Sequence, residues 1–300
     1  MKDKKNKNNP LVTILMNCRN EENFILRAIN SALSQSYKNI ELIVWDDASD
    51  DSTPKIIKSF NDKRLRFFEN KSHSGLGPSR CKAIGEVKGD LVAILDADDE
   101  MFQERIEKQV NEFKMNNNLA LVGSWVKFRD INGETIKYKF FKKNPYNIFL
   151  KSEQIKNQML TKNIFAHSSI MYKKENALKV GWYSKNLEYS QDYDLSLKLI
   201  KSYESKILTE LLTFITIRKE SMTQSTKLKK TRVKELITIL EKCKYEFKMN
   251  KKIAAINSRE IALNKLKLDL MNNISLITKL FSIIKTILKF PSLLFRLRLF

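Results

Sequence analysis

Apolar residues in the first hundred positions occur as short continuous runs that alternate with stretches of helical spacing. The runs are predicted strands and comprise VTILM (12–16), ELIVW (41–45), LRFF (65–68) and LVAIL (91–95). The helical stretches between them cover 22–36, the residues after Thr53-Pro54, and the residues from about Pro78. Strands that are apolar on both faces are typically covered on both sides. The pattern therefore predicts an α/β domain with a Rossmann-like, mostly parallel sheet and helices on both faces.

The pattern becomes mixed between about residue 101 and residue 223. Helices are predicted over 103–115 and 192–203, and strands over ALVGSWVKF (120–128), TIKYKF (135–140), AHSSIMY (166–172) and LLTFITI (211–217). After about Ser225 the chain is rich in lysine and helical in pattern. We therefore predict three parts, which are a disordered basic tail over 1–10, one α/β domain over 11–223, and a basic helical C-terminal region over 224–300.

Polar clusters follow three of the predicted strands, at the point where each strand ends. They comprise Asn17-Cys18-Arg19-Asn20, Asp46-Asp47-Ala48-Ser49-Asp50-Asp51 and Asp96-Ala97-Asp98-Asp99. Ligands of parallel sheets gather beyond the carboxyl ends of the strands, so the three clusters are predicted to converge. Carboxylate oxygens suit Mg²⁺ or Mn²⁺, and Mg²⁺ typically bridges to the phosphates of a substrate. The alternative is that these Asp-rich loops only cap helices and turn the chain.

A loop with two glycines precedes the helix that leads to the fourth predicted strand. It reads Gly75-Leu76-Gly77-Pro78-Ser79-Arg80. The glycines permit close backbone approach, a helix N-terminus favours an anion, and Arg80 can form paired hydrogen bonds with phosphate oxygens. The alternative is an ordinary loop with a solvent-facing arginine.

Taken in order, these motifs resemble those of the inverting family 2 glycosyltransferases with the GT-A fold. The resemblance rests on N-C-R-N (17–20), W-D-D-A-S-D-D (45–51), G-L-G-P-S-R-C (75–81), I-L-D-A-D-D (94–99) and Q-D-Y-D-L (191–195). It implies a metal-dependent enzyme that transfers a sugar, with inversion, from a nucleoside-diphosphate sugar to an acceptor hydroxyl. A UDP-sugar is the favoured donor and Mg²⁺ or Mn²⁺ the expected cofactor. The Q-x-x-R-W pattern of processive members is missing, which favours the addition of a single sugar.

The resemblance also assigns roles to individual residues. It implies that Asp46 reads the nucleotide base. The donor site is further expected to include Asn17, Arg19, Asp47 and Arg80. Asp96 is expected to contact the donor and the metal, Asp98 to bind the metal, and Asp192 to act as the catalytic base that takes the proton of the acceptor hydroxyl. The alternative for Asp192 is a carboxylate that only stabilises a helix N-terminus.

Several residues differ from the family pattern or lie outside the motifs given above. Asn17 replaces a common proline, and Arg19 replaces the aromatic residue expected against the base, although a guanidinium can also stack on a pyrimidine. His167 resembles a histidine that relatives carry near the acceptor, and we assign it no catalytic role. Arg218 stands where relatives tend to carry a histidine near the diphosphate, and a solvated surface arginine is the alternative.

Positive charge is concentrated at the C-terminus. The chain has a net charge of +21, and residues 227–300 hold 18 basic against 5 acidic side chains. Within this region, residues 274–290 place Ile, Leu and Phe on one helical face and Ser, Thr and Lys on the other. A basic amphipathic helix of this kind typically lies in an anionic membrane interface. The alternative is a helix that packs on the catalytic domain or on a partner subunit.

Cysteine usage and the N-terminus bear on the compartment. Cys18, Cys81 and Cys243 are scattered, which indicates neither a disulfide framework nor a zinc site and favours a reducing cytoplasm. The segment MKDKKNKNNP is too polar for a leader, and no stretch reaches the roughly 18 uncharged apolar residues of a membrane span. We therefore expect a cytoplasmic enzyme, peripheral on the inner face of the membrane. There it would act on a glycan or lipid-linked acceptor in cell-surface glycan or lipid-linked oligosaccharide synthesis.

Two other classes of function remain open. A nucleotidyltransferase on a related sheet would need a glycine- and lysine-rich first loop, and Asn17-Cys18-Arg19-Asn20 is not such a loop. A basic nucleic-acid-binding protein is suggested by the charge, but the sequence has no recognisable binding motif. Its aspartates would also repel a phosphate backbone unless a metal were bound. We therefore expect no nucleic-acid partner.

Overall fold

The structure is a computed structural model, and it describes residues 9–136, 151–218, 228–271 and 276–290. These residues fall into two compact units. The first unit comprises the described residues up to Ile155 together with Ile164–Arg218. The second comprises Lys156–Asn163 together with the described residues after Arg218.

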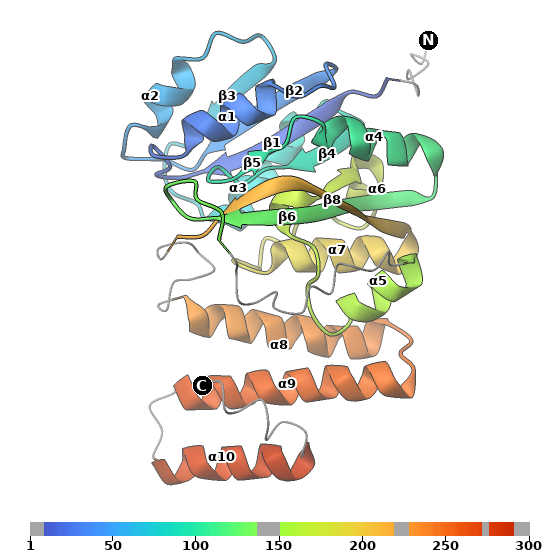
Figure 1. Cartoon of the computed structure of the whole chain (residues 1–300). Helices are drawn as coiled ribbons and strands as arrows, with labels where there is room; N and C mark the ends of the chain where they lie inside the picture. Colours follow the sequence, from blue (N-terminus) through green and yellow to red (C-terminus); the bar gives the residue numbers. More distant parts are fainter. Residues whose placement is uncertain (1–8, 137–150, 219–227, 272–275, 291–300) are drawn as a thin grey trace. The chain divides into compact units, whose positions relative to one another are not determined.

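One mixed sheet forms the centre of the first unit, and its described strands run in the order β3-β2-β1-β4-β7-β6-β8-β5 (Figure 1). The parallel half consists of β1 (Val12–Cys18), β2 (Ile40–Asp46), β3 (Leu65–Glu69) and β4 (Leu91–Ile94). Each of these strands contains one of the apolar runs of the sequence, because a continuous apolar run suits a strand that is buried on both faces. The predicted α/β sheet is therefore confirmed.

The other half of the sheet contains antiparallel pairs. Strand β7 (Met171–Lys173) pairs antiparallel with β4 and with β6 (Leu119–Arg129). Strand β8 (Glu204–Thr216) lies parallel to β6, and β5 (Glu100–Met101) pairs antiparallel with β8. This pairing brings the end of β8 next to the turn that follows β4, although more than a hundred residues separate them in the sequence.

Helices cover both faces of the sheet, as predicted. The helices α1 (Ile25–Leu33), α2 (Thr53–Lys58) and α4 (Arg105–Met115) share one face with alternate residues of β1, including Val12 and Ile14. The helices α3 (Leu76–Ala83), α6 (Lys174–Lys179) and α7 (Gln191–Ser202) lie on the other face (Figure 1). The first unit is thus a three-layer α/β/α structure.

Some predicted elements differ from the observed ones. The predicted strand over 166–172 is mostly a 3₁₀ helix, η3 (His167–Ser169), and only its end enters β7. The Ser169 N–H and hydroxyl both bond to the Ala166 carbonyl, which closes a helical turn in place of an extended strand. The predicted strand over 135–140 lies largely outside the described residues. Strand β5, the helix α5 (Ser152–Met159), α6 and the 3₁₀ helix η1 (Ile84–Glu86) were not predicted.

The second unit is helical, in agreement with the lysine-rich helical pattern of the sequence. Its described helices include α8 (Lys229–Glu246), α9 (Lys251–Met271) and α10 (Leu276–Lys289), and α9 packs against both of the others. Fully buried Asn257 of α9 donates from Nδ2 to the Leu160 carbonyl at 2.7 Å and to the Leu240 carbonyl at 3.1 Å. These bonds connect the 156–163 segment, which we had predicted in the 11–223 domain, to α8 and α9.

The predicted boundary between residues 223 and 224 falls outside the described residues. Most of the predicted tail over 1–10 also lies outside them. Of that tail, Asn9 and Pro10 are described, and their carbonyls accept hydrogen bonds from Asn39 and from the Tyr37 hydroxyl. Among the described helices, none combines the length and the apolar content that crossing a bilayer requires.

The start of β4 depends on a close backbone contact at Gly89. A Cβ atom added there would lie 2.5 Å from the Thr13 backbone nitrogen and 2.8 Å from the Leu11 carbonyl oxygen. The Gly89 N–H donates to the Thr13 hydroxyl at 2.9 Å, and that hydroxyl donates in turn to the buried carboxylate of Glu41. The register of β4 against β1, and hence the position of Asp96, depends on this contact.

We expect Gly89→Ala to lower the free energy of unfolding by about 1–3 kcal/mol, because the new methyl group meets backbone atoms that cannot move aside. Urea denaturation followed by circular dichroism measures this loss. Gly85→Ala is the matched control, since a Cβ atom at Gly85 has no neighbour within 4 Å. Equal stability of the two variants would contradict the proposed close contact.

Candidate functional site

The candidate site lies where β1, β2 and β4 end. Cys18 and Asp46, the last residues of β1 and β2, are register partners, and Leu15 of β1 is the partner of Ile94 at the end of β4. The three polar clusters that follow these strands therefore emerge at one edge of the sheet. The predicted convergence of the clusters is confirmed.

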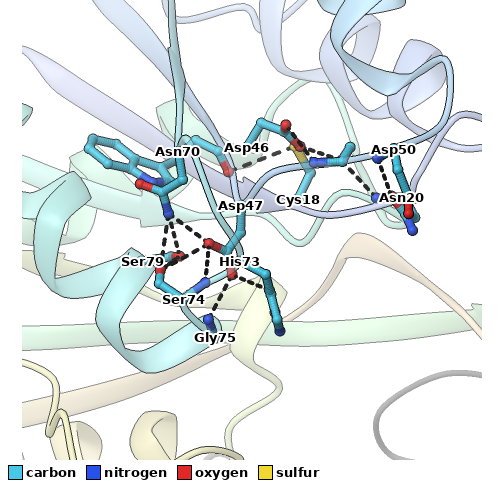
Figure 2. A network of polar contacts seen from close by, with 12 residues as sticks. Cys18, Asn20, Asp46, Asp47, Asp50, Asn70, His73, Ser74, Gly75 and Ser79 are labelled. Atoms are coloured by element: carbon cyan, nitrogen blue, oxygen red, sulfur yellow. Dashed lines mark hydrogen bonds and ion pairs between the residues drawn. The ribbon is translucent and has the colours of Figure 1, made fainter.

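Asp46 folds the turn that follows β2. Its side chain is fully buried, and its carboxylate accepts the Ser49 N–H at 3.0 Å and the Ser49 hydroxyl (Figure 2). The Cys18 thiol donates to the same carboxylate at 3.5 Å. Burial, followed by the negative charge of Asp46, raises the pKa of Cys18 well above its usual range. The Asp46 carboxylate thus holds this turn through Ser49 and is covered from solvent.

The turns after β1 and β2 are hydrogen-bonded to each other. Asn20, with a left-handed φ of 58°, donates its N–H to the Ser49 hydroxyl at 2.9 Å and accepts the Asp50 N–H at 3.1 Å. Arg19 lies directly before this connection, and its side chain is exposed. Asn17 lies inside β1 opposite Trp45, and its buried Nδ2 has no hydrogen-bond partner among the described residues. Of these predicted donor-site residues, only Arg19 reaches solvent freely.

Asp47 holds the loop that leads into α3. Its carboxylate accepts hydrogen bonds from Asn70 Nδ2 at 2.6 Å, from the N–H and hydroxyl of Ser74, both at 2.9 Å, and from the Gly75 N–H at 2.8 Å. His73 Nδ1 lies 2.8 Å from the same group (Figure 2). Burial by itself would raise the pKa of Asp47, but the hydrogen bonds from Asn70 and Ser74 lower it to about 2. The N–H groups of Ser74 and Gly75, directly before α3, thus bind Asp47.

Gly75, just before α3, and Gly77, in its first turn, have separate structural tasks. Gly75 has a φ of +89°, which disfavours any residue with a side chain. A Cβ atom at Gly77 would lie 2.9 Å from the Leu187 carbonyl oxygen and 3.3 Å from Gln191 Oε1. The close approach that Gly77 permits is therefore to the loop before α7, and it fixes the distance between α3 and the helix that carries Asp192.

Arg80 of α3 is buried and pairs with Asp96. Its Nη2 lies 3.2 Å from Asp96 Oδ1 and 3.1 Å from His167 Nδ1. The predicted alternative of a solvent-facing arginine is therefore wrong. His167 Nδ1 also lies 3.2 Å from Asp96 Oδ1, and its Nε2 lies 3.0 Å from the Tyr183 hydroxyl. Burial opposes ionisation of Asp96, but His167 and Arg80 together lower its pKa below the usual range.

His167 and Tyr183 belong to this site, although the sequence analysis gave the histidine no role and did not consider the tyrosine. The Arg80 guanidinium lies 5.5 Å from the centre of the Tyr183 ring, which places the ring beside the ion pair. The only sequence signal for His167 was its resemblance to a histidine of related proteins, and no local pattern distinguished Tyr183.

Asp192 lies in the first turn of α7 and is half-buried. Burial raises the pKa of Tyr183 to about 12, and the negative charges of Asp192 and Asp96 contribute to the same shift. The close approach of Gly77 to Gln191, the residue before Asp192, connects this helix to the site at the ends of the strands.

Asp98 pairs with Arg218, which follows the end of β8. Arg218 Nε lies 2.9 Å from Asp98 Oδ2, and its Nη2 contacts Glu21 Oε1. The alternative of a solvated surface arginine is therefore wrong. Burial and then repulsion from Asp98 raise the pKa of Glu21 to about 7 despite the contact with Arg218. Sequence analysis did not identify Glu21 as a site residue.

The acidic side chains suit a metal that is shared with a substrate. No group of three or more potential metal ligands occurs among the described His, Cys, Asp and Glu residues. Asp96 and Asp98 nevertheless offer carboxylate oxygens, and the buried Oε2 of Glu21 has no hydrogen-bond partner among the described residues. Mg²⁺ is typically held by one or two carboxylates and by substrate phosphates, so these residues fit such an ion.

Comparison with known proteins identifies relatives of the sequence. Residues 13–181 match the family profile described as Glycosyl transferase family 2. An uncharacterized glycosyltransferase of Methanocaldococcus jannaschii is 36% identical over 208 residues, which cover 68% of this chain and 69% of that protein. An uncharacterized glycosyltransferase of Haemophilus influenzae is also 36% identical, over 50% of this chain and 60% of that protein.

Solved structures with the same fold include two glycosyltransferase complexes. Residues 1–349 of TarS from S. aureus, in complex with UDP-GlcNAc, align with a TM-score of 0.66 at 15% identity and cover 92% of this chain and 80% of that one. The mannosyltransferase PcManGT from Pyrobaculum calidifontis, in complex with GDP-Man and Mn²⁺, aligns with a TM-score of 0.64 at 17% identity. This alignment covers 94% of this chain and 81% of PcManGT. These likenesses confirm the predicted GT-A fold.

We expect Asp47→Asn to lower the free energy of unfolding at neutral pH by about 1–3 kcal/mol, because an amide cannot accept the same set of hydrogen bonds. The folded-state pKa of about 2 lies below the unfolded value of about 4. The contribution of Asp47 is therefore complete above about pH 4 and is lost as the pH falls towards about 2.

Urea denaturation of the wild type and the variant between neutral pH and acid measures this difference, which should shrink as the pH falls. Asp50→Asn is the control, since Asp50 is exposed. If the difference between wild type and Asp47→Asn does not depend on pH, Asp47 does not hold the loop as a carboxylate.

Proposed function

The chain belongs to glycosyl transferase family 2, and from this premise we propose that it transfers a single sugar, with inversion, from a nucleoside-diphosphate sugar to an acceptor hydroxyl. The observation that carries this proposal is the arrangement of Arg80, Asp96, Asp98 and Asp192 around the ends of the parallel strands. It combines basic groups for a diphosphate, carboxylates for a metal, and a separate carboxylate for an acceptor.

For the donor, we propose a UDP-sugar. TarS binds UDP-GlcNAc and PcManGT binds GDP-Man, so proteins with this fold accept either nucleotide. The exposed side chain of Arg19 can stack on the base. Asp46 would bind the base by exchanging its hydrogen bond to Ser49 for one to the base. Asn17 and Asp47 shape this part of the site through the strand and the loop that they hold.

For the chemistry, we propose that Asp192 takes the proton of the acceptor hydroxyl as that oxygen attacks the sugar, and that Arg80 stabilises the charge on the departing diphosphate. Asp96 and Asp98 would hold Mg²⁺ or Mn²⁺, which supplies further positive charge at the diphosphate. A single displacement inverts the configuration of the sugar carbon and needs no covalent intermediate. The PcManGT complex, which contains Mn²⁺, supports the metal.

For the acceptor, we propose a glycan or lipid-linked oligosaccharide at the inner face of the cytoplasmic membrane. The second unit carries the features that support this location. Its helix α10 exposes the apolar side chains of Ile284 and Leu288, which are 48% and 76% accessible. Lys285 and Lys289 are exposed beside them. Apolar and basic side chains together typically bind an anionic membrane surface.

The donor chemistry is tested with the purified chain, Mn²⁺ and a panel of UDP- and GDP-sugars. We expect hydrolysis of one donor with release of a nucleoside diphosphate, because the sugar–phosphate bond is the one that breaks. A chelator should stop this release, and added Mn²⁺ or Mg²⁺ should restore it. In a separate assay with UTP or GTP and a sugar 1-phosphate, release of pyrophosphate would instead indicate a nucleotidyltransferase.

Once a donor and acceptor are known, Asp192→Asn should lower kcat at least about a hundredfold and leave donor binding nearly unchanged, because the base is lost while its shape is kept. Glu188→Gln is a matched control, since it removes an exposed carboxylate from the loop just before α7. Unchanged turnover in Asp192→Asn would mean that another residue is the base.

We expect the full chain to sediment with anionic liposomes at low salt and to bind less in high salt without complete release, because salt screens the lysines but not the apolar contact. Ile284→Ser combined with Leu288→Ser should reduce the bound fraction. A chain that ends at Asp269 should also bind less and keep its donor chemistry. Tyr245→Ser is the control, since it removes another highly exposed side chain of the second unit. A wild-type chain that stays in the supernatant would disprove membrane binding.

A further inference from the structure

Arg218 connects two carboxylates that are far apart in the sequence. Its Nη2 contacts Glu21, in the turn after β1, and its Nε lies 2.9 Å from Asp98 Oδ2, in the turn after β4. All three side chains are mostly buried, with 22%, 12% and 17% of the side-chain surface accessible for Arg218, Glu21 and Asp98. One guanidinium therefore pairs with both acids at the same time.

The end of β8 fixes Arg218 in this place. Two residues earlier, the Thr216 N–H donates to Asp99 Oδ1 at 2.9 Å, and the Thr216 hydroxyl donates to the Asp98 carbonyl. The Ile217 N–H donates to the Arg129 carbonyl at 2.8 Å. Hydrogen bonds from Thr216 and Ile217 thus hold the backbone to the acidic turn and to β6. Arg218 is therefore positioned before any ligand binds.

The two aspartates of the D-A-D motif pair with separate basic side chains. Asp96 pairs with Arg80 and His167, whereas Asp98 pairs with Arg218. A divalent ion that uses an oxygen of Asp98 would lie within a few ångströms of the Arg218 guanidinium. Two like charges at that distance in a mostly buried place repel each other strongly unless new negative charge arrives.

We infer that Arg218 couples the binding of a divalent cation to the binding of a diphosphate. Without a nucleotide, its guanidinium holds Asp98 and keeps the affinity of this site for the cation low. A diphosphate brings the negative charge that compensates for both cations, so the two ligands bind together more tightly than either does alone. This inference rests on the proposed function for the identity of the anion.

Glu21 completes this arrangement. Its Oε1 holds the far end of the guanidinium, while its buried Oε2 has no hydrogen-bond partner among the described residues. When Asp98 is released, Arg218 still contacts the Glu21 carboxyl group and does not become a buried charge without a partner, which would be costly. Arg218 is therefore a positioning residue that controls when Asp98 is available.

Direct Mn²⁺ binding tests the inference, with the full chain and electron paramagnetic resonance of the free ion as the readout. For the wild type, we expect UDP or GDP to tighten Mn²⁺ binding at least about tenfold. In Arg218→Gln, Mn²⁺ alone should bind at least about fivefold more tightly than in the wild type, and the tightening by the nucleotide should shrink by a similar factor. Because coupling is reciprocal, Mn²⁺ must tighten nucleotide binding by the same factor by which the nucleotide tightens Mn²⁺ binding. A titration of the nucleotide with and without Mn²⁺ checks this factor.

Arg64→Gln is the matched control, since Arg64 pairs with Asp62 in a partly exposed ion pair and its loss changes the net charge by the same amount. Its Mn²⁺ affinity should equal that of the wild type. Should Arg218→Gln fail to fold, Arg218→Lys serves instead, because one ammonium group cannot bridge Glu21 and Asp98 as the guanidinium does.

The inference and the proposed function fail in different ways. An unchanged affinity for Mn²⁺ alone in Arg218→Gln, or in Arg218→Lys if that variant is used, overturns the role of Arg218. The role of Arg218 is also overturned if the Mn²⁺ affinity of Arg64→Gln changes as much as that of Arg218→Gln, because the effect would then be one of net charge. If the wild type with Mn²⁺ binds neither UDP nor GDP, the proposed nucleotide-sugar function is wrong.

Discussion

The turn after β4 carries three carboxylates within four residues, and their mutual repulsion is the constraint on which the rest of the site depends. Carboxylates that are both buried and close together oppose each other's ionisation. The fold offsets this repulsion with hydrogen-bond donors and cations from distant segments. These partners are Arg80 of α3, His167 of η3, Thr216 at the end of β8, and Arg218 just after it. The acidic turn therefore joins elements that lie far apart in the sequence.

A further cation lies in the core next to this turn. Arg105 of α4 is fully buried, and its Nη2 donates to the carbonyls of Ile94 and Ile170 at 3.0 Å each. Burial lowers the pKa of Arg105 to about 9, although Asp99 and Asp96 favour its charged form. The guanidinium thus connects the end of β4 to the segment that carries His167. It also contributes positive charge to the acidic turn from the core side.

The three carboxylates of the turn have different environments. His167 and Arg80 lower the pKa of Asp96, whereas burial and then the neighbouring Asp98 raise the pKa of Asp99 well above its usual range. Asp99 accepts the Thr216 N–H and serves the structure. Asp96 and Asp98 face basic side chains that a charged ligand can replace or join. This division allows one short motif both to hold the fold and to present carboxylates at the candidate site.

Much of the parallel half of the fold could be predicted from the sequence, because each strand there is a continuous apolar run and each site turn directly follows a strand. The order of the motifs was enough to identify the family. The 3₁₀ helix at His167–Ser169 was missed because its serine bonds back to the chain and competes with an extended strand. The protein contacts of Asp47 and Gly77 could not be predicted, since a local pattern does not reveal which distant groups they meet.

The sequence by itself determined the α/β architecture and the sheet edge at which the acidic groups gather, because periodicity and strand ends are local properties of the chain. Only the tertiary structure decided which basic side chain pairs with which carboxylate. Arg218 and Glu21 are 197 residues apart, and His167 and Asp96 are 71 apart. Their contacts follow from the strand order β4-β7-β6-β8, which depends on how the whole sheet packs and not on the composition of any one segment.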